Sequence, residues 1–161
     1  MTEDITQLAQ RLGNELVAKG WQLTCAESCT GGGVGYAITS ISGSSAWFKT
    51  GFITYSNDAK HELLGVSENT LAQFGAVSCE TASEMATGAA MQANAEVAVA
   101  ISGIAGPDGG TPDKPVGTVC FGFFINGQKI TQTQVFAGDR QAVRLQAIEF
   151  ALSTSLTLLS K

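Results

Sequence analysis

The stretch EVAVAIS, residues 96–102, decides the fold class of this chain. Its nearly continuous run of apolar side chains is the pattern of a strand that is buried on both faces of a sheet. The alanine-rich residues 80–94 before it predict a helix, and GIAGPDGGTPDKP, residues 103–115, predicts a loop after it. A helix that leads into a doubly buried strand is typical of an α/β protein.

The segments that follow predict a mixed sheet. Residues 116–125 and 129–136 predict a hairpin, because Asn126-Gly127 between them is a strong signal for a tight turn. Asp139 then begins a long amphipathic helix. We predict an α/β fold that forms a three-layer sandwich, with helices on both faces of a mixed β-sheet.

The first 75 residues are predicted to alternate between helices and strands. We expect a helix from a Thr2/Asp4 start to Gly20, a strand over residues 21–26, a helix over 31–41, a strand over 50–55, a helix over 57–64 capped by Asn57, and a helix over 67–74 capped by Ser67. No repeat, low-complexity tract or linker interrupts the chain, so we expect a single domain over residues 1–161.

Composition and charge exclude several classes of partner. The 161 residues carry a formal net charge of −5 and contain no run of Lys or Arg. This argues against a nucleic-acid surface and against binding to an anionic membrane. The first residues lack the basic head and continuous apolar core of a signal peptide, so we expect a soluble, cytoplasmic protein.

Cysteine and histidine are too scattered to predict a metal site. Cys25, Cys29, Cys79 and Cys120 form no C-x-x-C pair, and His61 is the only histidine. We interpret the cysteines as small buried residues in a reducing compartment. We expect neither a metal nor an organic cofactor.

The segment AESCTGGG, residues 26–33, places a serine where a predicted strand runs into a helix. Ser28 would project from the carboxyl edge of the sheet, and the glycines let the following N–H groups face a phosphate or an oxyanion. The alternative is that Ser28 or Thr30 only caps the helix.

The segment TYSNDAK, residues 54–60, brings a tyrosine and a lysine to the next strand end. A lysine near a helix N-terminus opposes the helix dipole, so Lys60 does not stabilise this helix. It can act as a base for a serine if its pKa is lowered, with Tyr55 relaying the proton or holding the lysine. The alternative is a solvated lysine beside a half-buried tyrosine. A Ser-His-Asp triad would need His61, which has no evident orienting partner.

Two further segments are candidates for ligand binding. SGIAGPDGG, residues 102–110, leaves a strand end with enough glycine for close backbone approach to a ligand, although a plain surface loop would also fit. Arg140, in the GDR of residues 138–140, either pairs with Asp139 or binds an anion such as phosphate.

Six blocks together resemble the CinA C-terminal family: AESCTGG, GSSAWFKTGFITYSNDAK, GAVS at residues 75–78, SGIAGPDGG, KPVGTV and GDR. The resemblance runs from about Ser28 to Arg144. It implies hydrolysis of the carboxamide of nicotinamide mononucleotide, giving nicotinate mononucleotide and ammonia, a step in pyridine nucleotide recycling. Larger members carry an additional N-terminal nucleotide-hydrolysing domain, and we expect no such activity here.

The resemblance also implies roles for individual residues. Ser28 is the expected nucleophile, and Tyr55 and Lys60 are its expected activating partners. Ser102, where many members have threonine, is expected to contact the substrate or the oxyanion, and Arg140 is expected to bind the ribose phosphate. The other expected substrate contacts are Thr30, Gly31, Gly32, Gly103 and Gly106.

Two other functions fit the same residues. The main alternative is a non-catalytic, nucleotide-binding regulatory module, since glycine-rich loops bind nucleotides without chemistry too. The two functions differ in whether Ser28, Tyr55 and Lys60 converge within hydrogen-bond reach in a pocket. An esterase or peptidase is a third interpretation, for which no apolar acyl pocket is evident. We also expect a homo-oligomer, because enzymes of this size often form symmetric assemblies.

Overall fold

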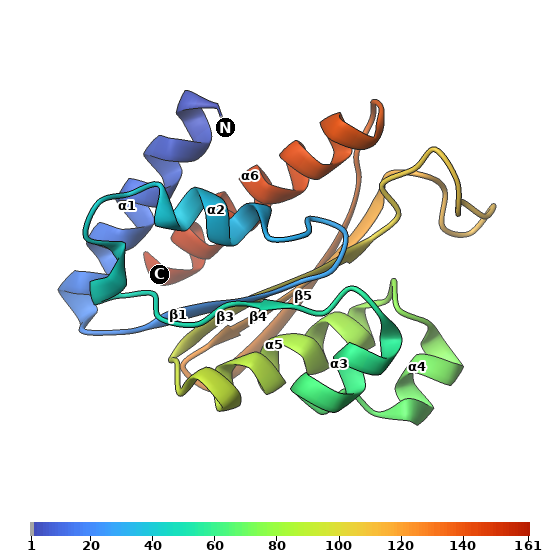
Figure 1. Cartoon of the computed structure of the whole chain (residues 1–161), viewed down its shortest axis with the longest axis horizontal. Coiled ribbons are helices and arrows are strands. Elements are labelled where there is room, and N and C mark those ends of the chain that lie inside the picture. Colours follow the sequence, from blue (N-terminus) through green and yellow to red (C-terminus); the bar gives the residue numbers. More distant parts are fainter. Residues whose placement is uncertain (1) are drawn as a thin grey trace.

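A mixed five-stranded sheet lies between two layers of helices in the computed structural model, which describes residues 2–161 (Figure 1). The strands, in the spatial order β2-β1-β3-β4-β5, are β1 Leu23–Glu27, β2 Phe52–Ile53, β3 Val97–Gly103, β4 Thr118–Ile125 and β5 Gln128–Val135. β1 pairs in parallel with β2 and β3, and the β3–β4 and β4–β5 pairs are antiparallel. The predicted α/β sandwich with a mixed sheet is confirmed.

The helices divide between the two faces of the sheet (Figure 1). One layer holds α1 Glu3–Lys19, α2 Gly33–Thr39 and α6 Arg140–Leu159, and the other side holds α3 Asn57–Leu64, α4 Glu68–Phe74 and α5 Cys79–Ala93. A short 3₁₀ helix, Ser44–Ala46, follows α2. Within residues 2–161, no helix is both long enough and apolar enough to cross a membrane.

The central strand β3 explains why its sequence is almost entirely apolar. Val97, Val99 and Ile101 point into the core beneath α1, α2 and α6, whereas Ala98 and Ala100 point into the core beneath α5. Successive side chains of a strand alternate between its faces, so both faces of β3 are buried. The small alanines let α5 pack close to the sheet.

Most helix and turn signals act as the sequence predicts. Thr2 and Ser67 cap α1 and α4 with their hydroxyl groups, and Asp139 caps α6 with its carboxylate. Asn126 and Gly127 both have positive φ, 46° and 96°, as the tight β4–β5 turn requires.

Several predicted boundaries differ from the structure, and for three of them the physical reason is clear. Ser56, not Asn57, caps α3, because the Ser56 hydroxyl accepts from the Ala59 amide. α2 begins at Gly33 rather than at residue 31, because the preceding glycines adopt left-handed conformations. The strand expected over residues 50–55 shrinks to β2, beyond which the chain leaves the edge of the sheet and turns toward α3.

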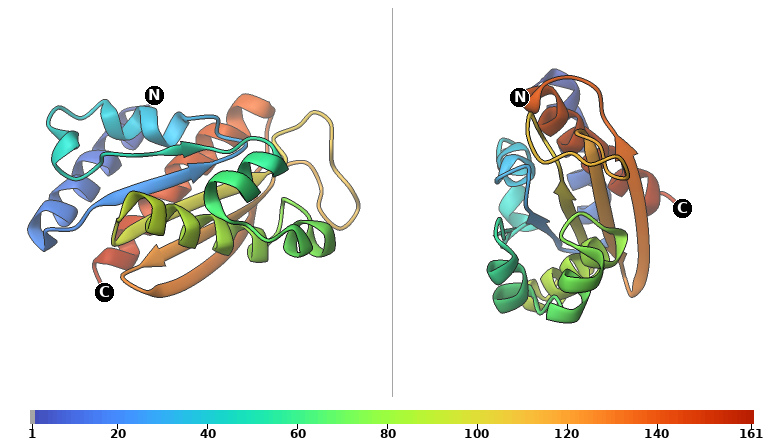
Figure 2. Two further views of the ribbon diagram at one scale, coloured as in Figure 1. Left: turned by 60° about the horizontal axis from the view of Figure 1, so that its bottom comes forward. Right: turned by 90° about the vertical axis from the view of Figure 1, so that its right-hand side faces the viewer.

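The carboxyl ends of β1, β2 and β3 meet at one edge of the sheet, at the right of Figure 1. The loops over residues 28–32, 54–56 and 104–117 all leave from this edge. The last of them projects beyond the rest of the molecule (Figure 2, left). This is the edge at which ligands of open α/β sheets bind.

Candidate active site

The Ser28 hydroxyl and the Lys60 amine form the centre of the site. Ser28 directly follows β1, and its amide donates to the carbonyl of Ile101 at 3.0 Å. Lys60 projects from α3, and its Nζ lies 3.0 Å from Ser28 Oγ. The Lys60 side chain is buried, with 1% of its surface exposed, so it is not the solvated lysine of the alternative interpretation.

Two carbonyl groups hold the amine of Lys60. Its Nζ donates to the carbonyls of Thr54 at 2.9 Å and of Tyr55 at 3.2 Å. No carboxylate in residues 2–161 lies within ion-pair distance of this amine. Burial lowers the pKa of Lys60 from its ordinary value, because the charged form loses hydration that nothing nearby fully replaces. A lowered pKa is what a lysine base requires.

Tyr55 contributes to the site through its main chain. Its carbonyl holds Lys60 and also lies 3.5 Å from Ser28 Oγ. Its side chain is 63% exposed, and its phenol oxygen accepts from Arg140 Nη2 at 3.3 Å. Of the two activating roles considered for Tyr55, this arrangement favours holding the lysine over relaying its proton.

Arg140 lies at the exposed side of the site. Besides the bond to the Tyr55 phenol, its Nη1 donates to the carbonyl of Gly106 at 2.9 Å. Asp139 is occupied as the cap of α6, where its carboxylate accepts from the Ala142 amide. Arg140 is therefore bonded to the loop after β3 rather than to Asp139, and its remaining N–H groups can serve an anion.

A cavity of about 280 Å³ joins these groups. Its size is near the lower end of the range of about 300–1,000 Å³ for small-molecule sites. It brings together six of the ten predicted site residues. Its lining consists of Ser28, Cys29, Tyr55, Asn57, Lys60, Ala76, Val77, Ser102, Gly103, Ala105 and Arg140.

The other four predicted contacts are not on the cavity wall. Thr30 is buried and donates its hydroxyl to the carboxylate of Glu27 at 2.6 Å. Gly31 and Gly32 form the left-handed turn before α2, and Gly106 contributes the carbonyl that holds Arg140. These four residues shape the loops around the site, and their contact with a substrate stays a prediction.

The sequence prediction missed two charged residues that support the loop after β1. The buried carboxylate of Glu27 accepts from the amides of Val34 at 2.9 Å and Gly35 at 3.0 Å, at the N-terminus of α2. Arg144, from α6, donates to the carbonyls of Cys29 and Thr30. Two sequence features could have revealed them. Glu27 is a carboxylate within a mostly apolar strand, and Arg144 lies one helical turn after Arg140.

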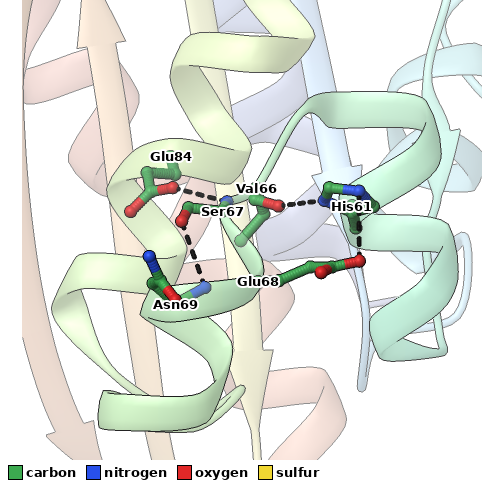
Figure 3. A network of polar contacts seen from close by, with 6 residues as sticks. All are labelled: His61, Val66, Ser67, Glu68, Asn69 and Glu84. Atoms are coloured by element: carbon green, nitrogen blue, oxygen red, sulfur yellow. Dashed lines mark hydrogen bonds and ion pairs between the residues drawn. The ribbon is translucent and has the colours of Figure 1, made fainter.

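Two other potentially reactive side chains, Cys29 and His61, have surroundings that differ from those of Ser28. Burial raises the pKa of the Cys29 thiol to about 11, which keeps it protonated near neutral pH. His61 does have polar partners, contrary to the sequence expectation, but these partners do not line the cavity that contains Ser28 (Figure 3). Its Nδ1 is 2.8 Å from the carbonyl of Val66, and its Nε2 is 3.4 Å from the carboxylate of Glu68.

A larger cavity of about 450 Å³ lies at the opposite end of the sheet, lined by residues such as Lys19, Trp21, Ile125 and Leu159. It contains none of the predicted site residues and no serine–lysine pair.

No group of three or more His, Cys, Asp or Glu side chains between residues 2 and 161 is placed to hold a metal ion.

A sequence profile of the CinA C-terminal domain matches residues 5–159, nearly the whole chain. The chain belongs to the CinA C-terminal domain family. The residues of the serine–lysine site, its cavity and both arginines of α6 all lie within the matched range.

Relatives within the family are similar over most of their length. Two proteins named nicotinamide-nucleotide amidohydrolase PncC are 62% and 56% identical to this chain. The first, from Enterobacter agglomerans, is matched over 93% of this chain and 92% of the relative. The second, from Escherichia coli K12, is matched over 94% and 92%. A crystal structure of a CinA superfamily protein from Klebsiella pneumoniae has a TM-score of 0.94 at 42% identity, covering 97% of this chain and 98% of the other.

Proposed function

We propose that this protein hydrolyses the carboxamide of nicotinamide mononucleotide to nicotinate mononucleotide and ammonia, with Ser28 as nucleophile and Lys60 as base. The observation that carries the mechanism is the 3.0 Å contact between Ser28 Oγ and the buried Nζ of Lys60. The substrate is supported by the names of relatives that are 49–62% identical. The reaction would recycle pyridine nucleotides.

The hydrogen bonds of Lys60 support its role as the base. A neutral amine has two N–H donors and one lone pair, and the carbonyls of Thr54 and Tyr55 accept from the two donors. The lone pair is then directed at Ser28 Oγ, the third group bonded to Nζ. In this state the serine hydroxyl donates its proton to the amine, which is the first step that nucleophilic attack requires.

The reaction then proceeds in two halves. Ser28 Oγ attacks the amide carbon while its proton moves to Lys60, and the ammonium of Lys60 returns a proton to the departing nitrogen, which leaves as ammonia. This leaves an ester on Ser28. Water attacks that ester, Lys60 accepts a proton from the water and gives one back to Ser28 Oγ, and nicotinate mononucleotide is released.

The loop after β1 can stabilise the oxyanion. The amides of Ser28, Gly31 and Gly33 are already bonded, to the carbonyls of Ile101, Ser28 and Thr30. In the described chain this leaves the amides of Cys29, Thr30 and Gly32 without a protein partner. We assign the Cys29 amide as the oxyanion donor, because it adjoins the nucleophile and Cys29 lines the cavity.

Arg140 would bind the phosphate at the open side of the cavity. Its guanidinium has five N–H donors, of which the structure uses one for the Gly106 carbonyl and one for the Tyr55 phenol. The remaining donors suit a phosphate group. Binding the phosphate at a distance from Ser28 would position the carboxamide for attack.

The test measures ammonia release from nicotinamide mononucleotide by the wild-type protein, by Ser28→Ala and by a chelator-treated sample. We expect release that survives chelation and is lost in Ser28→Ala, while calorimetry still detects nucleotide binding to the variant. Binding without release by the wild-type protein would instead support the regulatory module. Release by Ser28→Ala at the wild-type rate would refute the nucleophile.

A further inference from the structure

Arg144 connects helix α6 to the loop that carries Ser28. Its Nε donates to the carbonyl of Cys29 at 3.0 Å, and its Nη2 donates to the carbonyl of Thr30 at 3.3 Å. No carboxylate in the described part of the chain lies within ion-pair distance of this guanidinium. The cation is therefore committed to two successive carbonyls next to the nucleophile.

The bonds from Arg144 to these carbonyls also fix the direction of two amide groups of the same loop, those of Gly31 and Cys29. A trans peptide group holds its C=O and N–H in opposite directions, so a bond that fixes the carbonyl also aims the amide. The carbonyl of Thr30 shares its peptide group with the N–H of Gly31, which donates to the carbonyl of Ser28 at 3.1 Å. The carbonyl of Ser28 shares its peptide group with the N–H of Cys29. Two linked peptide groups thus run from Arg144 to the Cys29 amide.

The loop is shaped to admit the guanidinium. Gly31 has a φ of +57°, and a Cβ at this position would lie 3.2 Å from Arg144 Nη2. A side chain at residue 31 would therefore crowd the arginine as well as strain the backbone. The other end of the loop is held by Glu27, whose carboxylate accepts from two amides of α2.

We propose that Arg144 is a positioning residue that aims the Cys29 amide at the oxyanion formed during amide hydrolysis, an inference that rests on the proposed function. The oxyanion exists in the transition state and not in the bound substrate. Losing the hydrogen bond that stabilises it therefore lowers kcat more than it raises KM. Removing one oxyanion donor lowers kcat by about 10²–10³. For Arg144→Ala, which misdirects the donor without deleting it, we expect a fall in kcat of roughly 10–10².

The experiment compares Arg144→Ala, Arg144→Lys and Arg11→Ala with the wild-type protein. Arg11 is exposed on α1 and serves as a matched removal of one positive charge. Steady-state kinetics give kcat and KM, with and without added guanidinium ion. Amide exchange by NMR follows the N–H of Gly31, which reports the loop without any substrate.

We expect Arg144→Ala to lower kcat with KM within about threefold of wild type, and to lose exchange protection at Gly31. Guanidinium ion should restore part of kcat, and Arg144→Lys should be intermediate, because one amine cannot bond both carbonyls as the guanidinium does. Arg11→Ala should behave as wild type. A loss confined to KM, an unchanged kcat, or unchanged exchange at Gly31 would overturn the proposal. If the wild-type protein releases no ammonia, the proposed function fails, and exchange at Gly31 still decides whether Arg144 orders the loop.

Discussion

Replacing Lys60 with methionine removes the proposed base and keeps an unbranched side chain in the same buried position. Loss of a general base lowers rates by about 10²–10⁴. At about 1.36 kcal/mol for each factor of ten, this corresponds to roughly 2.7–5.4 kcal/mol of transition-state stabilisation. We expect Lys60→Met to lower kcat/KM by a factor of at least about 10², because Lys60 is the basic side chain that is bonded to Ser28 Oγ.

The same change should leave the protein folded. Methionine cannot donate to the carbonyls of Thr54 and Tyr55, but the Ser28 hydroxyl is 3.5 Å from the Tyr55 carbonyl and can turn toward it. The Thr54 carbonyl then lacks a partner, and an unpaired buried acceptor costs about 1–3 kcal/mol. Removing a buried amine that is poorly hydrated offsets part of this cost. We expect the free energy of unfolding to fall by less than about 3 kcal/mol.

The assay measures ammonia release as a function of pH, with Lys49→Met as the matched loss of an exposed lysine. Burial lowers the Lys60 pKa below its ordinary value of 10.5, so the neutral base accumulates as pH rises through the lowered pKa. We expect wild-type kcat/KM to rise along this limb and Lys60→Met to lack it. Turnover by Lys60→Met within tenfold of wild type, with the limb retained, would refute the assignment.

The lowered pKa of Lys60 has a consequence for stability as well. The unfolded chain binds the lysine proton more tightly than the folded chain does. The free energy of unfolding should therefore rise with pH between the lowered pKa and 10.5, and be smallest below that window, where the buried amine is charged. Denaturant titrations across this range check the sign, and Lys60→Met should lose the slope.

Three further predictions follow from the contacts of individual residues. Tyr55→Phe should retain kcat, because the carbonyl of residue 55 still holds Lys60, and should raise KM less than tenfold through the lost bond to Arg140. Arg140→Ala should raise KM at least about tenfold with a smaller change in kcat, and equal turnover of nicotinamide riboside by the wild-type protein would contradict the phosphate contact. Gly88→Ala should lower the free energy of unfolding by about 1–3 kcal/mol, because the new Cβ would collide with the Leu64 carbonyl oxygen; a thermal melt that matches wild type would show that α3 and α5 can separate there.

Local signals predicted the elements well because they act within a few residues. The hydroxyl of Ser67 and the carboxylate of Asp139 cap the helices that directly follow them, and Asn126-Gly127 forms its own turn. The same signals failed where two neighbouring residues could each act. Ser56 rather than Asn57 caps α3, because Ser56 has the extended backbone of an N-cap residue and Asn57 is already helical.

The amino-acid sequence alone determined that β3 is buried on both faces, that Ser28 follows a strand, and that the six blocks resemble the CinA C-terminal family. Only the tertiary structure decided that Lys60, 32 residues from Ser28, is buried against its hydroxyl, and that Tyr55 holds it by its carbonyl. It also decided that Arg144, 115 residues from Cys29, holds the loop after β1. The physical reason is that periodicity and capping specify neighbours along the chain, whereas these contacts exist because parallel strands and α6 bring distant residues to one edge of the sheet.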